Sequence, residues 1–414
     1  MSGGEHVLDT LVARGFVHQM SDEVRLREML STPTTYYTGF DPTGPSLTVG
    51  HLVPVMMMAH LQQAGHRPIV LSGGGTGMIG DPSGKSTSRP MLTRENVDAN
   101  VASQREQLVR FLEFDDGRGL VLNNADWLWE LSWLEFMRDY GRLFSVNQML
   151  TLEIYRTRLD DNQPLTFLEF SYQLLQAYDF LHLYRTHGCL LQCAGSDQWA
   201  NCLAGMDLIR RVEGAEAGVL CAPLLTTASG QKMGKTEHGA LYLSPAQTSP
   251  YDFYQYFVNL DDRDIAKCLK LFTFLSLDEI TELCAVEGAA LNEAKRRLAW
   301  EVTALVHGAP EADRARDAAK ALFGGGGAPG EGAPTSELRA AQFDGTLTIV
   351  DLFCQIGLAA SRSAVKRLVE QGGCYLNEER VDTLDRVVDL ADVRDGGILL
   401  RAGKKRYHRV VLID

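Results

Sequence analysis

The sequence predicts an α/β fold: a Rossmann-like, doubly wound parallel sheet, then a helical domain, then a small α+β domain. Three observations predict it. In the first half of the chain, segments rich in β-branched and aromatic residues alternate with helical patterns, as in parallel strands joined by helices. From about 250 to 322 the patterns are helical. A segment rich in glycine and proline, 323–340, then separates a short tail from the rest.

Length and composition exclude several classes of protein. The chain has 414 residues, of which 45% are hydrophobic and 22% charged, which is enough for a sizeable core and unlike a disordered chain. No uncharged apolar run approaches the ~18–20 residues of a membrane span. Acidic residues occupy the N-terminal stretch where an export signal would be apolar. We therefore expect a cytoplasmic protein with no membrane partner.

The spacing of the cysteines and the distribution of charge exclude further classes of protein. None of the eight cysteines forms a C-x-x-C pair, and no histidine pair follows at zinc-site spacing. We expect free thiols and no metal site. The net charge is −13, but residues 341–414 hold 11 basic and 11 acidic side chains. A locally basic tail on an acidic body indicates an anionic partner for the tail alone.

The strands and helices of the first part follow in order. A strand is expected over Thr34–Phe40, because β-branched and aromatic residues precede the turn Asp-Pro-Thr-Gly. A helix over Val49–Ala64, a strand over Arg67–Leu71 and a strand over Cys189–Ala194 come next. Such sheets bind ligands beyond the carboxyl ends of their strands. The segments at those ends are 37–43, 73–85 and 195–198.

A glycine-rich loop follows the second strand. Residues 75–80 match G-x-G-x-x-G, which by itself is typical of a dinucleotide site. Turn residues, 81–84, stand where a helix should continue, and Ile79 stands where a P-loop needs glycine. What remains is a loop with Lys85 and Arg89 that suits the phosphates of a polyanion. The alternative is a glycine-rich surface turn.

Two helical segments also carry polar residues. Ser46–His51 lies at a strand–turn–helix junction, where the helix N-terminus favours negative charge. A histidine such as His51, taken by itself, is more often a capping or surface residue than a ligand-binding one. In Phe167–Phe180, polar side chains recur four and three residues apart, on one helix face. That face meets either a polar ligand or water. These polar residues are Tyr172, Gln176 and Asp179.

Two basic segments are further candidates for binding an anionic ligand. Lys232–Thr236 is a basic glycine loop, ordinarily a solvated turn unless a polyphosphate binds nearby. In the tail, Ser361 can cap a helix over Arg362–Gln371, and a strand is expected over Cys374–Asn377. The basic residues of the tail that suit an anionic partner are Arg362, Lys366, Arg367, Lys404, Lys405 and Arg406.

Together these motifs are similar to those of class I aminoacyl-tRNA synthetases. TVGH (48–51), GSDQW (195–199) and KMGKT (232–236) resemble the two nucleotide-binding motifs and the segment between them. YTGFDPT, GDPSGK and FSYQLLQAYDF, with an S4-like tail, narrow the resemblance to bacterial tyrosyl-tRNA synthetases over 34–414. The sequence departs from that family at Thr48, where the first histidine of the first motif is missing.

The resemblance implies roles for the matching residues. Tyr37 and Asp179 would hydrogen-bond the phenolic hydroxyl of a tyrosine substrate. Asp81, Tyr172 and Gln176 would hold its α-ammonium group. The residues lining ATP and the adenylate would be Gly39, Gly50, Gly195, Asp197, Gln198 and Lys235. The catalytic residues at the phosphates would be Thr43, His51, Lys85, Arg89, Lys232, Lys235 and Thr236.

The implied activity is that of a tyrosine–tRNA ligase. ATP with Mg²⁺ and L-tyrosine would give tyrosyl-adenylate and pyrophosphate, and tyrosine would pass to the 3′ end of tRNA(Tyr). No tightly bound cofactor is implied, and the tyrosine carboxylate is already a nucleophile, so catalysis rests on positioning and charge stabilisation. One alternative is an NAD-dependent oxidoreductase with an RNA-binding tail. Another is an RNA-binding regulator with an inactive synthetase body, against which Asp81, Lys232 and Lys235 argue.

The resemblance also implies domains and an oligomeric state. Residues 1–230 would form the catalytic domain with a dimerisation insertion, and 231–322 the second nucleotide motif and a helical domain. A flexible linker, 323–340, would precede an S4-like RNA-binding domain over 341–414. Phe167 would lie near the two-fold axis of a homodimer.

Overall fold

The computed structural model divides the chain into two compact units. The first comprises Met1–Thr236, Ala240–Gln247 and Leu260–Ala294, and the second Glu237–Gly239, Thr248–Asn259 and Lys295–Asp414. The structure describes residues 6–83, 92–236, 239–286, 288–323, 335–343, 345–359, 361–394, 396–403 and 406–413, without the side chains of 235, 236, 289 and 321–323.

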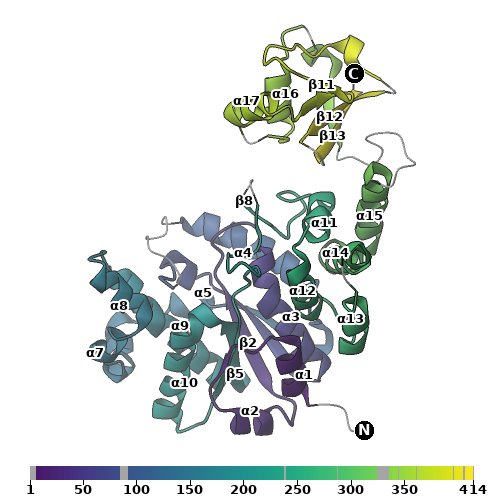
Figure 1. Ribbon diagram of the computed structural model, residues 1–414. Coiled ribbons are helices and arrows are strands. Elements are labelled where there is room, and N and C mark those ends of the chain that lie inside the picture. The colour runs from purple at the N-terminus through teal and green to yellow at the C-terminus, as the bar shows by residue number, and fades with distance from the viewer. Residues whose placement is uncertain are drawn as a thin grey trace. The chain divides into compact units, whose positions relative to one another are not determined.

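A six-stranded sheet forms the centre of the first unit (Figure 1). Its order is β1 (Gln19–Met20), β6 (Gly218–Ala222), β5 (Cys189–Gly195), β2 (Thr35–Phe40), β3 (Arg67–Ser72) and β4 (Leu120–Asn123). Strands β2 to β6 are parallel, and β1 alone is antiparallel. The chain proceeds from β2 outward through β3 and β4, then returns to β5 on the other side. The predicted doubly wound sheet is confirmed, and its strand order reverses between β2 and β5.

Alternating residues of β2 show which helices cover each face. The hydroxyl of Tyr36 donates to the carbonyl of Met58 in α3 (Val49–Gln63). Tyr37 points to the opposite face and packs with Phe180 of α9 (Phe167–His187) and with Leu208 of α10 (Trp199–Glu213). Because the sheet is covered on both faces, most residues of its central strands are buried.

Local signals explain the limits of α9. Thr166 and Glu169 form a reciprocal capping box at its start, and Gly188 adopts the left-handed conformation after its last turn. The helix therefore runs past the stretch 167–180 that carried the polar pattern, and its last residue before the cap is His187.

The remaining helices and strands of the first unit are shorter or lie outside the sheet. They are α1 (Val7–Arg14), α2 (Glu23–Met29), η1 (Thr76–Met78), α4 (Arg94–Leu108), η2 (Asp115–Gly117), α5 (Ala125–Leu128), α6 (Trp133–Asp139), η3 (Gly141–Leu143), α7 (Val146–Met149), α8 (Glu153–Asp160), η4 (Ser196–Gln198), α12 (Asp262–Phe272), α13 (Leu277–Leu283) and η5 (Gly288–Leu291). Two short strands, β7 (Lys235–Thr236) and β8 (Gly239–Ala240), pair with each other.

The second unit contains a five-stranded sheet. Its order is β11 (Glu379–Arg380), β10 (Cys374–Leu376), β12 (Gly397–Ala402), β13 (Arg406–Ile413) and β9 (Thr335–Arg339). One face packs on α16 (Ile349–Gln355) and α17 (Arg362–Glu370) through buried residues such as Phe353, Val365 and Ile398. Its other elements are α11 (Pro250–Val258), α14 (Asn292–His307), α15 (Ala309–Phe323), η6 (Ala340–Gln342) and η7 (Leu390–Asp392).

Two expected boundaries differ from the structure. Residues 335–339, part of the expected linker, form β9, because their backbone pairs in parallel with β13 from Arg409↔Thr335 to Ile413↔Arg339. Composition alone does not reveal that pairing. The helical stretch expected over 231–322 is also divided, since α12 and α13 belong to the first unit whereas α11 and α15 belong to the second.

Two further expectations can be compared with the described residues. All eight cysteines are free, and six of them are buried, as expected for reduced thiols. Within the described ranges no helix is long and apolar enough to cross a membrane. The same residues contain no cluster of three or more His, Cys, Asp or Glu side chains suited to a metal ion.

Candidate active site

The centre of the site is a buried network at the carboxyl ends of β2 and β3. Asp41 follows β2, and its Oδ1 accepts a hydrogen bond from the hydroxyl of Thr76 at 2.8 Å. Its Oδ2 accepts from the phenolic hydroxyl of Tyr172 in α9, also at 2.8 Å. A Cβ on Gly73 would lie 2.1 Å from Asp41 Oδ1, so the loop after β3 approaches this closely only with glycine there.

Asp179 closes the far end of the same network. Its two carboxylate oxygens accept hydrogen bonds from Asn124 Nδ2 and Trp127 Nε1, each at 2.8 Å. Asn124 Nδ2 also donates to the hydroxyl of Thr76 at 2.9 Å, which connects Asp179 to Asp41. Burial raises the pKa of Asp179 to about 7, the donors from Asn124 and Trp127 oppose that rise, and the Asp41 charge adds to it.

Tyr37 lies beside Asp179 with its hydroxyl unsatisfied. The side chain is 1% exposed, and its hydroxyl has no hydrogen-bond partner among the described residues. Burial raises the pKa of Tyr37 well above its usual value, and the neighbouring Asp179 charge adds to the rise. The Oε1 atom of Gln176, on the same helix as Asp179, is also buried without a partner in those residues. A buried polar group without a hydrogen-bond partner lowers the stability of the fold by about 1–3 kcal/mol, and a ligand that bonds to it removes that penalty.

Asp81 connects β3 with β5 across the point where the strand order reverses. Its Oδ2 accepts from Gln198 Nε2 at 2.6 Å, and its Oδ1 accepts from the backbone N–H of Ser83 at 2.9 Å. Gln198 Oε1 in turn accepts from Asn201 Nδ2 at 3.1 Å. The carboxylate is 7% exposed. A negative charge is thus held in place between two strand ends.

The residues expected around ATP lie nearer the surface. Gly39 is an exposed position of β2, Gly50 lies in the first turn of α3, and Gly195 ends β5. Asp197 is exposed at the start of η4, yet surrounding protein raises its pKa, as does the Asp81 charge, while Lys232 opposes both. Thr43 is exposed on the turn after β2.

The two expected nucleotide motifs lie against each other. The backbone N–H of Val49, in the first motif, donates to the carbonyl of Leu241 at 3.0 Å, and that of Leu241 donates to Gly234 at 2.7 Å. Gly234, in the second motif, has φ +82°, and a Cβ there would lie 2.3 Å from Val49 Cγ1. Glycine is therefore required both for conformation and for close approach. Lys232 is exposed beside this contact.

His51 takes part in capping α3. Its Nδ1 lies 3.0 Å from both the backbone nitrogen and the hydroxyl of Thr48, the residue before the first helical turn. Thr48 therefore stands at the N-cap in extended conformation, a position that favours threonine. Both histidine interpretations, capping and catalytic, apply to a side chain at a helix N-terminus.

The remaining predicted residues have different outcomes. Arg362, Lys366 and Arg367 are exposed on α17, where Arg362 pairs with Asp351 at 3.0 Å and Lys366 with Glu370 at 3.9 Å. Arg406 donates to the carbonyl of Leu358. Four predicted residues fall outside the described part of the chain: Lys85, Arg89, Lys404 and Lys405. For Lys235 and Thr236 only the backbone, in β7, is described.

Sequence reasoning missed several polar residues of this network, Thr76 among them. Asp41, Asn124 and Trp127 supply its carboxylate and two of its donors. Asp41 had a signal, since it directly follows a predicted strand end. No sequence pattern pointed to Asn124 or Trp127. They reach Asp179 from the segment after β4, a strand not predicted from the sequence, and they are 55 and 52 residues from Asp179 in sequence.

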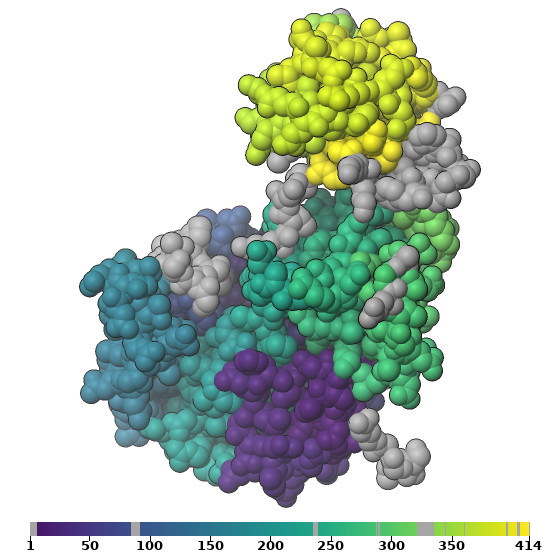
Figure 2. All heavy atoms as spheres, viewed as in Figure 1, coloured from purple at the N-terminus to yellow at the C-terminus, as the bar shows by residue number. Residues whose placement is uncertain are grey.

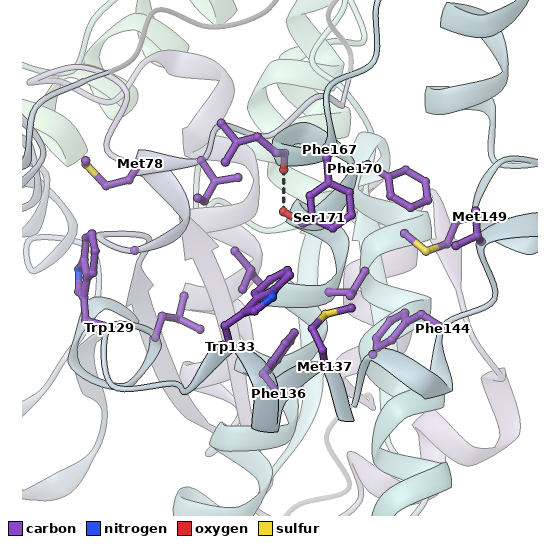
Figure 3. Close-up of a pocket in the computed structure, with 18 residues that line it drawn as sticks. Met78, Trp129, Trp133, Phe136, Met137, Phe144, Met149, Phe167, Phe170 and Ser171 are labelled. Carbon is purple, nitrogen blue, oxygen red and sulfur yellow. Dashed lines mark hydrogen bonds between the residues drawn. The ribbon is translucent and has the colours of Figure 1, made fainter. Parts of the chain in front are cut away.

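An apolar cavity of about 480 Å³ lies behind the glycine-rich loop. Figure 3 shows aromatic side chains from α6 and α9 facing this space, among them Trp133, Phe136 and Phe170. Trp133 and Phe167 form an edge-to-face pair with ring centroids 6.1 Å apart. Their exposed fractions, 56% and 63%, are large for aromatic side chains and are typical of a protein contact surface.

Comparisons with known proteins identify the family. A family model described as tRNA synthetases class I (W and Y) matches residues 29–324, and one for the tyrosine–tRNA ligase SYY-like C-terminal domain matches 331–410. A tyrosine–tRNA ligase of Desulfatibacillum aliphaticivorans is 49% identical over 427 residues, with 99% of each chain covered. One from Acetivibrio thermocellus is 47% identical over 408 residues, covering 98% of this chain and 99% of its own.

A solved structure has the same fold over the larger part of the chain. It is a C-terminally truncated mitochondrial tyrosyl-tRNA synthetase of Aspergillus nidulans, with TM-score 0.71 and 28% identity, covering 78% of this chain and 95% of its own. None of these matches supports the oxidoreductase alternative.

Proposed function

This chain belongs to the class I tRNA synthetases of the tryptophan and tyrosine type, and we infer that it is a tyrosine–tRNA ligase. It activates L-tyrosine with ATP and transfers the tyrosyl group to tRNA. The observation that carries this assignment is the pairing of an unsatisfied Tyr37 hydroxyl with the buried Asp179 carboxylate.

That pair matches a phenol. A substrate hydroxyl would donate to Asp179 and accept from Tyr37, which satisfies the buried hydroxyl of Tyr37. A phenylalanine ring offers neither interaction, and an indole N–H can only donate. The polar end of the pocket thus favours tyrosine over both other aromatic amino acids.

The ammonium group of the substrate would lie among the carboxylates near α9. Asp81 and Asp41 present negative charge at adjacent strand ends, and Tyr172 lies against Asp41. Gln176 offers a buried carbonyl oxygen without a partner in the described residues. An ammonium group donates three hydrogen bonds and would offset these charges.

ATP would enter as its magnesium complex at the carboxyl ends of the strands. We place the adenosine beside Gly39, Gly195, Asp197 and Gln198, and the phosphates at the N-terminus of α3, which carries Gly50 and His51 and favours anions. The tyrosine carboxylate attacks the α-phosphate, and pyrophosphate departs. Residues assigned to the departing phosphates on the resemblance are Thr43, His51, Lys85, Arg89, Lys232, Lys235 and Thr236.

The tail would hold the tRNA. Exposed basic residues on α17, of which Arg367 has no ion pair in the described residues, suit a phosphate backbone. Lys404, Lys405 and Arg406 belong to the same proposal on the sequence pattern. We keep the proposed division into a catalytic domain, a helical domain and an S4-like RNA-binding domain, with β9 counted in the last.

We also propose a homodimer, acting in the cytoplasm. The apolar surface around Trp133 and Phe167 supports it, because a two-fold contact buries the same patch twice. Phe167→Asp should give a folded monomer in sedimentation, since the ring is 63% exposed within one chain and is not part of its core. A dimer in that variant would contradict the proposed interface.

The activity has a direct test. Exchange of labelled pyrophosphate into ATP should require tyrosine, and each of the other amino acids should give little exchange. Charging of tRNA(Tyr) should follow in the same preparation. Exchange driven equally by tryptophan or phenylalanine would contradict the assignment of the pocket.

A further inference from the structure

The second nucleotide motif is carried by a hairpin that rests on α12. Residues 225–233, here named the signature hairpin, are closed by Met233 N–H to Leu225 O at 2.9 Å and Thr227 N–H to Gln231 O at 2.7 Å. Lys232 pairs with Thr226 across the hairpin. The position of the Lys232 backbone is therefore set by its neighbours at the base of the hairpin.

Two adjacent residues of α12 contact that base. The Lys267 ammonium group donates to the carbonyl of Thr226. The Cys268 thiol lies 3.8 Å from the thioether sulfur of Met233, and these two side chains are 0% and 3% exposed. Thr226 is the cross-strand partner of Lys232, and Met233 follows Lys232 in sequence. The contacts thus flank Lys232 on both strands of the signature hairpin.

α12 is itself fixed to the helices beneath the site. The buried guanidinium of Arg14 donates to the carbonyls of Lys270, Thr273 and Leu275, at 3.2, 2.9 and 2.5 Å. Phe274 packs edge-on against His60 of α3, with ring centroids 5.0 Å apart. Figure 2 shows the purple N-terminal segment lying against the green segment of the chain that includes α12. The helix that bears the first nucleotide motif and the helix under the second are thereby held together.

We propose that Lys267 and Cys268 are positioning residues, which hold Lys232 at the nucleotide end of the site through the signature hairpin. This rests on the proposed role of Lys232 in stabilising the departing phosphates. Lys232 is exposed and belongs to a hairpin, so its placement depends on what fixes the base of that hairpin. A charge-assisted hydrogen bond at one strand and a buried sulfur contact at the other supply that constraint.

The test separates positioning from a purely structural role. Lys267→Met keeps the aliphatic stem and removes the donor. The single-turnover rate of tyrosyl-adenylate formation should fall about tenfold, while the tyrosine dissociation constant without ATP stays unchanged. The unfolding temperature should fall only slightly, because the variant also loses the ion pair of Lys267 with the buried Asp264, whose charged atoms are 3.9 Å apart. Lys267→Arg should restore most of the rate. Lys270→Met, a matched change on the same helix, should leave the rate as it is.

Cys268→Ala tests the second contact and should slow the same step several-fold with tyrosine binding intact. The double variant Lys232→Ala/Lys267→Met shows whether Lys267 affects the rate of adenylate formation through Lys232. If Lys267 acts through Lys232, the double variant is no slower than Lys232→Ala alone. An additive loss, a normal rate in Lys267→Met, or a parallel loss of tyrosine binding would overturn the proposal.

Lys232→Ala distinguishes a failure of the positioning proposal from a failure of the proposed role of Lys232 at the phosphates. If Lys232→Ala slows adenylate formation and Lys267→Met does not, the positioning proposal alone fails. If Lys232→Ala leaves the rate unchanged, the proposed role of Lys232 at the phosphates fails, and the positioning proposal fails with it.

Discussion

The two ends of the site are built in different ways. At the amino-acid end, the carboxylates of Asp41 and Asp81, in the loops after β2 and β3, and of Asp179, on α9, all accept hydrogen bonds, and Tyr172 on α9 is one of the donors. At the nucleotide end, Thr43, His51 and Lys232 are exposed on turns, a helix start and a hairpin. On the proposed assignment, the groups for the amino acid are therefore held by the fold, whereas those for the phosphates are exposed to water.

The difference has a physical cause. A polar group that is buried must find partners as the protein folds, since an unsatisfied one costs about 1–3 kcal/mol. An exposed lysine or threonine has no such requirement, because water satisfies it. Changes at the amino-acid end should therefore alter binding and stability together, and changes to exposed side chains at the nucleotide end, such as Lys232, should alter the rate alone.

The strongest test of this contrast is Asp179→Ala. It removes the acceptor for the substrate hydroxyl and leaves Asn124 and Trp127 as buried donors without that acceptor. A loss of about 3–5 kcal/mol corresponds to a fall of roughly 10²–10⁴-fold in kcat/KM for tyrosine. Pyrophosphate exchange measures the activity and calorimetry the expected loss of stability. Full activity would disprove the pocket.

Lys232→Ala should give the opposite profile. The side chain is exposed, so its removal should leave the unfolding temperature and the tyrosine dissociation constant unchanged. A charge-assisted contact to the departing phosphates is worth about 2 kcal/mol, and adenylate formation should slow about thirtyfold. Single-turnover kinetics give the rate. Weaker tyrosine binding in this variant would contradict the predicted difference between the two ends of the site.

The pH dependence of tyrosine binding sharpens the comparison. Burial raises the pKa of Asp179 to about 7 in the empty site, and a donated phenolic proton would favour the ionised carboxylate and lower that pKa in the complex. Affinity should thus be full above pH 7 and fall, by up to about tenfold per unit, as pH drops below 7. Titration calorimetry from pH 5.5 to 8.5 measures it, and Asp179→Asn should abolish the slope.

The smallest effect is expected at Thr48. Thr48→Ala removes the N-cap side chain and its contact with His51, which should cost about 1 kcal/mol of stability. Adenylate formation should change less than in Lys232→Ala, because a neutral hydroxyl is a weaker partner for phosphate than an ammonium group. Thr48→Ser serves as the control that keeps the cap. A larger kinetic loss in Thr48→Ala would give that residue the role of the missing histidine.

Short-range patterns in the sequence determined much of the fold. The β-branched run before Asp-Pro-Thr-Gly became β2 with bounds Thr35–Phe40, one residue from those expected. The stripe of Tyr172, Gln176 and Asp179 lies on one helix, as its spacing requires. Such features depend on residues within a few positions of each other, so periodicity and turn chemistry reveal them.

Tertiary structure alone decided which distant side chains meet. Asn124 and Trp127 reach Asp179 only because β4 lies beside β3 in the sheet and α5 follows directly. Residues 335–339 look like linker until β13 supplies their backbone partners, and Lys267 meets Thr226 only after α12 packs beneath the hairpin. These contacts join segments from 41 to more than 70 residues apart, and local propensity carries no information about pairings that topology brings together.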